Sequence, residues 1–377
     1  MIDLSDLTRA MRSPETYPHE TRGIEVVQTQ MSVVFLTGQY AYKVKKPVNF
    51  GYLDYSTLER RRDLCHRELE LNRRLCPDVY MEVAAITELS GKIRLGGSGQ
   101  VLEYAVKMRQ LPRDRMMDEL LRSAIVSLDM VHEVAVKLAD FHHRADTGKY
   151  INEFGETCSV ILNTDENFDQ TERYVGRSIT EAQFRRIREY SNSFLRSHAA
   201  LMHDRIDEGR IRDCHGDLHA AHVCFTRTGI CIYDCIEFND RLRYTDVASE
   251  VAIMAMDLDR FARQDLSVEF VDAYVKASND QTLRAMLPFY KCYRAYVRGK
   301  AESFSLDSAF LPEEHKTAAL KNARRYFELA HAYASKTPSQ KASFEQVCEL
   351  TESEHLIANT SGDWNETLAR IVERTDP

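Results

Sequence analysis

The first third of the chain consists of short apolar runs interrupted by turn signals. Residues 24–48, IEVVQTQMSVVFLTGQYAYKVKKPV, carry β-branched and aromatic runs with TGQ as a hairpin connection, and they predict three strands. Residues 56–75, STLERRRDLCHRELELNRRL, place leucines at helical spacing after a hydroxyl residue suited to the N-cap, and predict a helix. Two further strand-like runs lie near residues 82–96 and 100–108. We therefore expect a mixed sheet that carries one helix.

The pattern changes at Pro112 to long segments with helical periodicity. Apolar residues recur every three or four positions through MMDELLRS, IVSLDMVHEVAVKLADFHHRA and ITEAQFRRIREYSNSFLRSHAALMHDRIDEG. Two short β-like pieces, HVCFT and GICIYDC, interrupt them before helices resume at Val247 and continue to about Lys336. The tail after Thr337 is more polar and holds one further helical candidate, ETLARIVER. The expected parts are a β-rich lobe at residues 1–111, a helical lobe at residues 112–336 and a polar tail at residues 337–377.

Composition narrows the class of protein. Lys and Arg number 50 against 58 Asp and Glu, giving a formal net charge of −8. This balance argues against non-specific binding to nucleic acid, which needs a surplus of positive charge. No run of about 18 apolar residues occurs, so we expect no membrane-spanning segment. The first residues lack the basic and apolar regions of a signal peptide, and we expect a cytoplasmic protein. The oligomeric state is left open.

The nine cysteines are expected to be reduced thiols, as is usual without a secretory signal. Cys224, Cys231 and Cys235 lie close together, which raises the alternative of a metal site. None of them forms a CxxC pair, and two of the three stand among Val, Phe and Ile. Cysteine in such surroundings is usually a small buried hydrophobe, and we favour that interpretation.

The densest group of reactive side chains is RDCHGDLHAAHVCF at residues 212–225, followed by ICIYDCIEFND at residues 230–240. Histidines and an acid at this density fit a metal site, a catalytic loop of a phosphotransferase, or a polar turn. A phosphotransferase makes further demands: a Lys on a strand, an acid on the next helix to hold that Lys, a catalytic acid and metal ligands downstream. A β-rich region followed by helices has the layout that this chemistry needs.

At this point the sequence resembles a known family. HGDLH at 215–219, with IYDCIEF at 232–238, resembles the aminoglycoside phosphotransferase family, which has the α+β, two-lobed protein-kinase-like fold. VFLTGQYAYKVKKPVNFGYLDYSTLERRR, with CHRELELNRRL, is similar to one bacterial branch whose longer members append a P-loop kinase domain. The resemblance covers most of residues 20–335, and the P-loop motif GxxxxGK[ST] is absent from this sequence.

The resemblance implies roles for three residues of the polar group. Asp217 would be the general base that orients or deprotonates an acceptor hydroxyl. Asp234, at the end of ICIYD, would bind the Mg²⁺ that bridges the β- and γ-phosphates, with Mn²⁺ as the alternative ion. His222 stands where the family carries a metal-binding Asn. It either coordinates a metal, or donates a hydrogen bond to Asp217, or marks a weakened metal position, and imidazole suits Zn²⁺ or Mn²⁺ better than Mg²⁺.

Neighbouring polar residues are given smaller roles. His215 is expected to hold the loop together by hydrogen bonds, and His219 is a supporting polar residue. Glu237 either assists the metal or the acceptor, or pairs with Arg241 or Arg243 at a loop surface; Asp246, before an apolar-periodic run, is expected to cap the next helix.

Lys43 is the candidate for the phosphate-binding lysine. In a strand, alternate residues share a face, so Lys43 points away from Tyr42 and Val44. Lys45 is the alternative on the same face, although a solvated basic edge strand explains Lys45 better than Lys43. By the family's register Glu68 would pair with Lys43, and Glu70 is its competitor.

The adenine-binding hinge of the family would fall at Met108, Arg109, Gln110 and Leu111. The loop joining the first two strands, QTQM, contains no glycine to close over phosphates, so contacts from around Ser32 would have to serve.

The acceptor is expected to bind in the helical lobe. Lys291, Arg294 and Arg298 share one face of a predicted helix at spacings of three and four. Such a face either recognises an anionic acceptor or is simply solvated, and we favour the solvated face.

These features together predict an ATP-dependent phosphotransferase, with GTP as the alternative donor, acting on a hydroxyl of a small molecule. A nucleotide-binding pseudokinase with a regulatory role is the alternative, favoured by His222 and the glycine-free loop. A zinc hydrolase built on His215, Asp217, His219 and His222 is the third interpretation. Gly216 disfavours the helix that a zinc site with this spacing needs. The zinc-hydrolase interpretation also leaves Lys43 and Glu68 unexplained.

Overall fold

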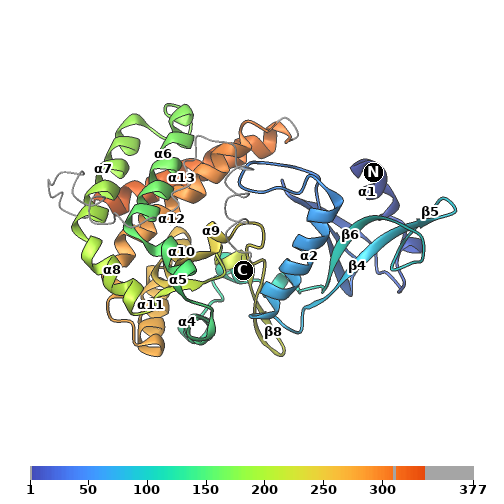
Figure 1. Ribbon diagram of the computed structural model, residues 1–377, viewed down its shortest axis with the longest axis horizontal. Coiled ribbons are helices and arrows are strands. Elements are labelled where there is room, and N and C mark those ends of the chain that lie inside the picture. The colour runs from blue at the N-terminus through green and yellow to red at the C-terminus, as the bar shows by residue number, and fades with distance from the viewer. Residues whose placement is uncertain (1, 309–310, 336–377) are drawn as a thin grey trace. The chain divides into compact units, whose positions relative to one another are not determined.

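The computed structural model describes residues 2–308 and 311–335 (Figure 1). The polar tail and its helical candidate ETLARIVER lie outside the described residues. The chain divides into two compact units. Of the described residues, unit 1 comprises 2–126 together with 215–243, and unit 2 comprises 127–214, 244–308 and 311–335. The expected boundary after residue 111 does not coincide with this division, because residues 215–243 pack with the sheet rather than with the helices.

Unit 1 is built on a six-stranded antiparallel sheet with the order β1-β2-β3-β6-β4-β5. Its strands are β1 (Glu25–Gln28), β2 (Ser32–Leu36), β3 (Tyr40–Lys45), β4 (Tyr80–Leu89), β5 (Lys92–Leu95) and β6 (Gln100–Arg109). The three strands predicted at residues 24–48 are therefore confirmed. The run at residues 82–96 forms a hairpin, because Ser90 and Gly91 adopt positive φ angles and turn the chain.

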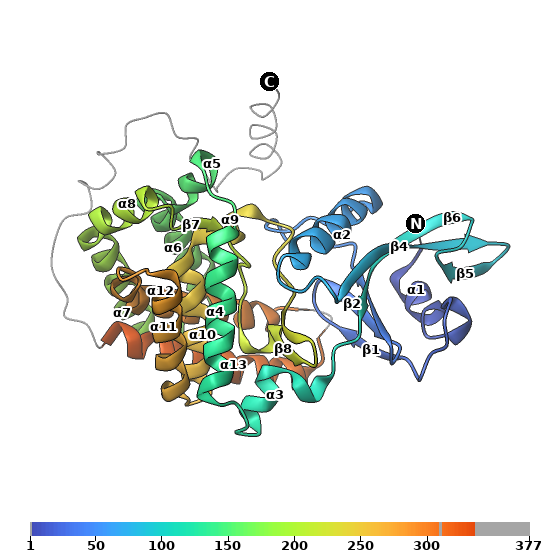
Figure 2. The same cartoon turned by 90° about the horizontal axis from the view of Figure 1, so that it is seen from below.

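The two faces of the sheet are covered by different helices. Tyr42 and Val44 of β3 pack in one cluster with Leu7 and Met11, in and just after α1 (Leu4–Ala10). Ala41, on the opposite face, packs in a second cluster with residues of α2 (Leu58–Arg73), whose position beside the sheet is visible in Figure 2. Because side chains alternate along a strand, the lysines of β3 at positions 43 and 45 face α2.

Residues 215–243 add a small hairpin and two short helices to unit 1. They contain a 3-10 turn (Ala220–His222), β8 (Val223–Thr226), β9 (Gly229–Ile232) and α9 (Asp240–Arg243), while 3-10 turns and α3 (Met117–Arg122) lie earlier in the unit. Cys224 and Cys231 pack in the same cluster as Ala41 and Met108. Cys224 and Cys235 are buried, as expected of small hydrophobes.

One expectation about the cysteines is wrong. Cys76 and Cys231 form a disulfide, with their Cα atoms 4.9 Å apart. Cys76 follows the end of α2, and β9 packs against that end, so two positions 155 residues apart in sequence become neighbours. Local sequence contains no signal for this contact.

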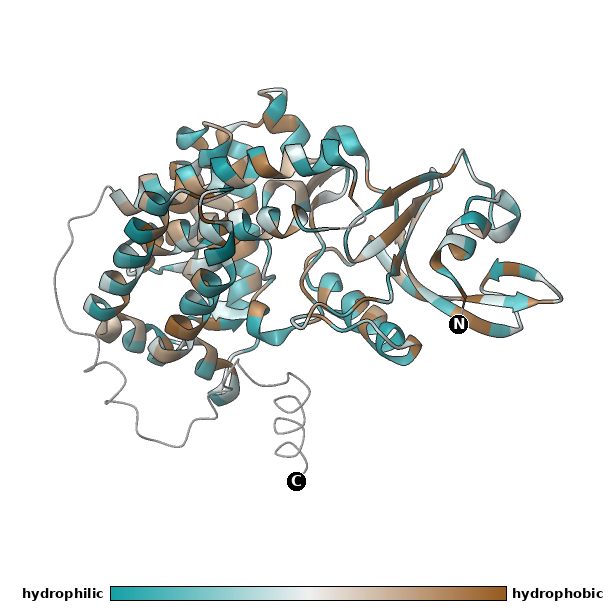
Figure 3. Cartoon of the chain, turned by 90° about the horizontal axis from the view of Figure 1, so that it is seen from above, coloured by the Kyte–Doolittle hydropathy of each residue, from teal (hydrophilic) through white to brown (hydrophobic). Residues whose placement is uncertain are grey.

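Unit 2 is helical, and in Figure 3 apolar and polar residues alternate along its helices. Its helices are α4 (Leu128–Arg144), α5 (Lys149–Asn152), α6 (Thr157–Thr171), α7 (Glu181–Ser197), α8 (Ala199–Asp207), α10 (Val247–Arg260), α11 (Gln264–Ser278), α12 (Leu283–Ser305) and α13 (Glu313–Ser335), with a two-stranded pair formed by β7 (Ile211–Asp213) and β10 (Tyr244–Asp246). The predicted long helix after residue 179 is two helices, because the chain leaves helical geometry at His198. Asp246 caps α10 as predicted, accepting a 2.8 Å hydrogen bond from Ala248 N.

Among residues 2–308 and 311–335, no helix is long and apolar enough to cross a membrane. This agrees with the absence of long apolar runs noted in the sequence.

Candidate active site

The loop that contains HGDLH is shaped by Gly216. This residue has φ +91°, and a Cβ at this position would lie 3.0 Å from the carbonyl oxygen of Leu242 and 3.1 Å from Ile236. His215 is fully buried, and its Nε2 lies 2.9 Å from the carbonyl oxygen of Tyr233, while its Nδ1 accepts a hydrogen bond from Asp217 N at 3.3 Å. His215 therefore holds the loop by hydrogen bonds, as predicted.

Asp217 lies beside two imidazole rings. Its Oδ2 is 3.5 Å from His219 Nε2, and its backbone carbonyl lies 2.8 Å from His222 Nδ1. The rings of His219 and His222 have their centroids 3.9 Å apart. The Asp217 side chain remains 32% exposed, so its carboxylate is reachable from solvent in a way that the fully buried His215 is not.

Asp234 follows β9 and adopts a left-handed backbone conformation with φ 65°. Such a conformation is strained for a residue other than Gly and is found often at functional sites. Its Oδ1 lies 2.5 Å from Lys43 Nζ, and its Oδ2 lies 3.5 Å from His222 Nε2. Burial alone would raise the pKa of the Asp234 carboxyl, but Lys43 and His222 outweigh burial and hold this pKa well below its usual range. Asp234 is therefore a carboxylate at neutral pH.

His222 is also affected by its surroundings. Burial and the neighbouring His219 lower the pKa of His222 to about 3, so the ring is neutral at neutral pH. Of the three alternatives for His222, the hydrogen bond to Asp217 is present, but it is made to the backbone carbonyl rather than to the carboxylate. The Nε2 edge faces Asp234, as a ligand to a shared cation would.

Lys43 and Lys45 both contact Glu68. Lys43 Nζ lies 2.9 Å from Glu68 Oε1, and Lys45 Nζ lies 2.6 Å from Glu68 Oε2. Burial would lower the pKa of Lys43, but Asp234 and Glu68 raise it well above its ordinary value. Glu70, the competitor of Glu68, is exposed. The position of Glu68 follows from α2, whose buried residues recur at helical spacing: Arg61, Cys65, Glu68, Leu71 and Asn72.

The solvated-edge interpretation of Lys45 is wrong. Lys45 is 1% exposed, and β3 lies inside the sheet between β2 and β6. Its ammonium group also pairs with Glu237, which is 3% exposed and accepts a hydrogen bond from the hydroxyl of Tyr55. Glu237 is thus a buried partner of Lys45, and the alternative of a surface pair with Arg241 or Arg243 does not describe it.

Asn72 is a member of the site that sequence reasoning missed. Its side-chain oxygen accepts a 2.9 Å hydrogen bond from Cys235 N, and its side-chain nitrogen donates a 2.8 Å bond to the carbonyl oxygen of Glu68. It lies one helical turn after Glu68, and this spacing on the buried face of α2 is the only signal that the sequence carried.

Comparison with known proteins assigns the family. A model of the phosphotransferase enzyme family matches residues 58–289. The chain belongs to this family. The α+β, protein-kinase-like fold that the sequence predicted is thereby confirmed, together with the resemblance on which the prediction rested.

Curated relatives of this phosphotransferase family member include uncharacterized proteins of Mycobacterium bovis and Mycobacterium tuberculosis. Each is 34% identical over 281 residues, which is 74% of this chain and 54% of the relative. The chain therefore spans about half the length of the curated relatives it matches.

Comparison with solved structures finds matches of low sequence identity. A choline/ethanolamine kinase family protein from Mesorhizobium loti has a TM-score of 0.48 and 11% identity, over 89% of this chain and 100% of that chain. A glucosamine kinase in complex with glucosamine, ADP and inorganic phosphate has a TM-score of 0.42 and 13% identity, over 81% of this chain and 75% of that chain.

The backbone of the expected hinge is partly engaged in hydrogen bonds within the protein. Arg109 N donates to the carbonyl oxygen of Val79 at 2.9 Å, and Gln110 N donates to that of Gln39 at 3.0 Å. These two N–H groups are therefore used within the protein, and contact of residues 108–111 with adenine stays a prediction. Met108 is 9% exposed and lies in the cluster that contains Ala41.

The loop between β1 and β2 is a closed turn. Thr29 N donates to the carbonyl oxygen of Ser32 at 2.9 Å, and Ser32 N donates to Thr29 Oγ1 at 2.9 Å. Ser32 is 3% exposed, so its hydroxyl does not supply the phosphate contact that the glycine-free loop called for.

The basic face of α12 is engaged within unit 2. Lys291 Nζ lies 2.9 Å from both Asp259 Oδ2 and Ser267 Oγ, and Arg294 Nε donates to Ser249 Oγ at 2.9 Å. The guanidinium of Arg298 lies 5.8 Å from the ring centroid of Tyr326. This face is half-buried and internally paired, so neither a solvated surface nor a ready anion-binding wall describes it.

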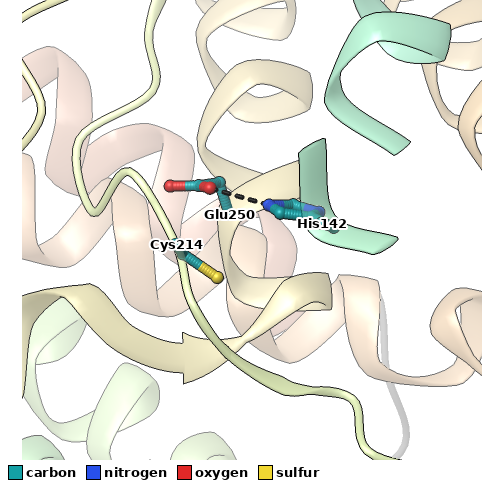
Figure 4. Close-up of side chains that lie close together, drawn as sticks. All are labelled: His142, Cys214 and Glu250. Atoms are coloured by element: carbon teal, nitrogen blue, oxygen red, sulfur yellow. Dashed lines mark hydrogen bonds and ion pairs between the residues drawn. The ribbon is translucent and has the colours of Figure 1, made fainter. Parts of the chain in front are cut away.

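A second group of potential metal ligands lies in unit 2, where His142, Cys214 and Glu250 come together (Figure 4). His142 Nδ1 lies 2.7 Å from the hydroxyl of Tyr274, and its Nε2 lies 2.8 Å from Glu250 Oε2. Both ring nitrogens are therefore used in hydrogen bonds. A metal would have to displace the bond to Glu250, so hydrogen bonding accounts for this group.

Proposed function

We propose that this chain is an ATP-dependent kinase that transfers the γ-phosphate to a hydroxyl of a small molecule. The observation that carries the proposal is the convergence of Lys43, Asp217 and Asp234 in unit 1, linked through Glu68 and His222. They come from a strand, the HGDLH loop and the end of β9, which supply the lysine, catalytic acid and metal-binding acid of phosphoryl transfer. Family membership supports the same reaction class.

Asp217 is proposed as the general base. A base has to reach the acceptor hydroxyl, and the carboxylate of Asp217 is the most exposed ionisable group of the HGDLH loop. His215 and Gly216 fix the backbone on which Asp217 sits. The carboxylate would orient the hydroxyl for in-line attack and take up its proton.

The donor set at Asp234 fits a divalent cation. Lys43 holds one oxygen of the carboxylate, which leaves the other oxygen directed toward His222. A cation such as Mg²⁺, bound here, neutralises negative charge on the triphosphate. Lys43 would contribute to phosphate binding, while Glu68 keeps its ammonium group in position.

Nucleotide binding without turnover is the second candidate, and the closed Thr29–Ser32 turn favours it. A turn that is hydrogen-bonded to itself, with a buried hydroxyl, has less to offer the phosphates than a glycine-rich loop. In that case the chain would bind ATP and act as a regulatory or binding module.

The test separates binding from transfer. ATP binding is measured by calorimetry with a non-hydrolysable analogue and Mg²⁺, and transfer by ADP release in the presence of a panel of small amino alcohols and sugars. We expect Asp217→Asn to bind the analogue as the wild type does and to lose turnover by about 100-fold or more. Asp204→Asn, which changes an exposed acid in unit 2, is the matched control.

Equal turnover in wild type and Asp217→Asn would remove Asp217 from the reaction. Binding without acceptor-dependent ADP release in any panel member would favour the regulatory alternative. Absence of nucleotide binding would overturn the proposal as a whole.

A further inference from the structure

The orientation of His222 leaves one ring nitrogen for a ligand. Its Nδ1 lies 2.8 Å from the backbone carbonyl oxygen of Asp217, and a carbonyl oxygen can only accept, so Nδ1 carries the hydrogen. This hydrogen bond fixes the tautomer and the direction of the ring. Nε2, the other ring nitrogen, lies 3.5 Å from Asp234 Oδ2.

The side chain and backbone of Asp234 are also held in place by contacts with neighbouring residues. Its Oδ1 pairs with Lys43 Nζ at 2.5 Å, and its backbone N–H donates to the hydroxyl of Tyr80 at 3.2 Å. Oδ2 is the oxygen that remains toward His222. His222 Nε2 and Asp234 Oδ2 thus lie 3.5 Å apart, a separation at which one cation can contact both atoms.

The spacing fits a common ion. Metal–nitrogen and metal–oxygen bonds of about 2.0–2.2 Å place two ligand atoms about 3–3.5 Å apart. His222 also belongs to a neighbouring group of potential ligands, because one ligand atom each of Asp217, His219 and His222 lies within 4.8 Å of the others. Histidines that bind a metal through one ring nitrogen usually donate the hydrogen of the other nitrogen to a backbone carbonyl or a carboxylate, which fixes the orientation of the ring.

We infer that the cation site of this kinase selects a divalent transition ion of the Mn²⁺ class over Mg²⁺, with His222 Nε2 and Asp234 Oδ2 as its protein ligands. Mg²⁺ prefers oxygen ligands and keeps its waters, whereas imidazole nitrogen suits transition ions. The role of the ion in phosphoryl transfer rests on the proposed function, but the selectivity itself is a property of these two side chains.

Two of the other histidine–carboxylate pairs among the described residues show what distinguishes this one. Both ring nitrogens of His142 are engaged in hydrogen bonds, one with Tyr274 and the other with Glu250. His203 lies 3.8 Å from Asp207 on the exposed surface of α8, and both side chains are more than two-thirds exposed. His222 combines a fixed tautomer, a side chain only 15% exposed and an acceptor oxygen opposite its second nitrogen.

The test is a titration of the full chain with Mn²⁺ in the absence of nucleotide, followed by loss of the aqueous Mn²⁺ EPR signal, with Mg²⁺ as competitor. We expect wild type to bind Mn²⁺ more tightly than Mg²⁺ by about tenfold or more. His222→Asn, which restores an oxygen ligand, should lose this excess. His203→Asn is the matched control and should keep the wild-type ratio.

A wild-type ratio of dissociation constants near one, or no Mn²⁺ binding by wild type, would overturn the inference without need of the variant. A ratio that His222→Asn leaves unchanged would do so as well, once its unfolding temperature shows that it is folded. Mg²⁺-dependent ATP binding and turnover are measured separately. If they persist while Mn²⁺ selectivity is absent, the kinase proposal stands and only the metal assignment fails.

Discussion

The side-chain oxygen of Asn72 on α2 accepts a 2.9 Å hydrogen bond from the backbone N–H of Cys235, the residue that follows Asp234. The same side chain donates to the carbonyl oxygen of Glu68. One buried amide therefore connects the helix that carries Glu68 to the segment that carries Asp234.

We expect Asn72→Leu to destabilise the protein by about 1–3 kcal/mol, because it leaves Cys235 N–H buried without its acceptor. Asp234 should lose its fixed position, so nucleotide affinity should fall as well. Chemical denaturation and calorimetry with an ATP analogue measure the two effects. Asn163→Leu, which replaces a half-buried amide on α6 of unit 2, is the control for the loss of an amide side chain. Unchanged nucleotide affinity in a destabilised Asn72→Leu would limit Asn72 to a structural role.

Gly216→Ala should disrupt the HGDLH loop. A Cβ there would lie 3.0 Å from the backbone oxygen of Leu242, and φ +91° is strained for any residue with a side chain. We expect turnover to fall more than the thermal unfolding temperature does, since the change displaces Asp217 directly. Gly176→Ala, also at positive φ but with open space around its Cβ, separates backbone strain from steric contact. Equal losses in the two variants would show that contact with Leu242 is unimportant.

Lys45→Met should be more destabilising than Lys46→Met. Lys45 is fully buried between Glu68 and Glu237, and removing one partner of a buried ion pair costs about 3–5 kcal/mol. Lys46 is a partly exposed residue whose ammonium group contacts the carbonyl oxygen of Thr29. The free energy of unfolding from urea denaturation checks the difference. Similar values for the two variants would mean that Lys45 contributes little beyond its surface neighbour.

Acid should weaken unit 2 through Asp280. Burial would raise the pKa of this carboxyl, but its hydrogen bonds and charge contact with Arg205 outweigh burial and lower the pKa. A carboxyl whose pKa is lower in the folded state stabilises the protein above its unfolded pKa of about 3.9, and this stability is lost as the pH falls through the folded pKa. Asp280→Asn should therefore be less stable at neutral pH and show a shallower loss below about pH 4. Thermal unfolding as a function of pH measures the slope, and a slope identical to that of wild type would contradict the assignment.

The direction of several side chains in the candidate site could be predicted, because it depends on local sequence patterns. The alternation along β3 separates Tyr42 and Val44 from the lysines, whichever fold surrounds the strand. The family's register selects Glu68 over Glu70, and in the structure Glu68 is buried on α2 while Glu70 is exposed. The HGDLH and IYDCIEF motifs identified the family, and with it the fold.

What only the tertiary structure decided is which of these side chains meet. Lys45 and Glu237 are 192 positions apart, and Cys76 and Cys231 are 155 apart. Periodicity constrains the face of an element but not its partner. It leaves Lys45 open between an alternative phosphate-binding lysine and a solvated edge residue, and it gives no sign that Cys231 is paired. The same holds for His222. The sequence gives its residue type, but the direction of its Nε2 depends on the backbone carbonyl of Asp217 and the carboxylate of Asp234, which the fold places beside the ring. Sequence determines the chemistry that each element presents, and long-range packing determines the distances at which that chemistry operates.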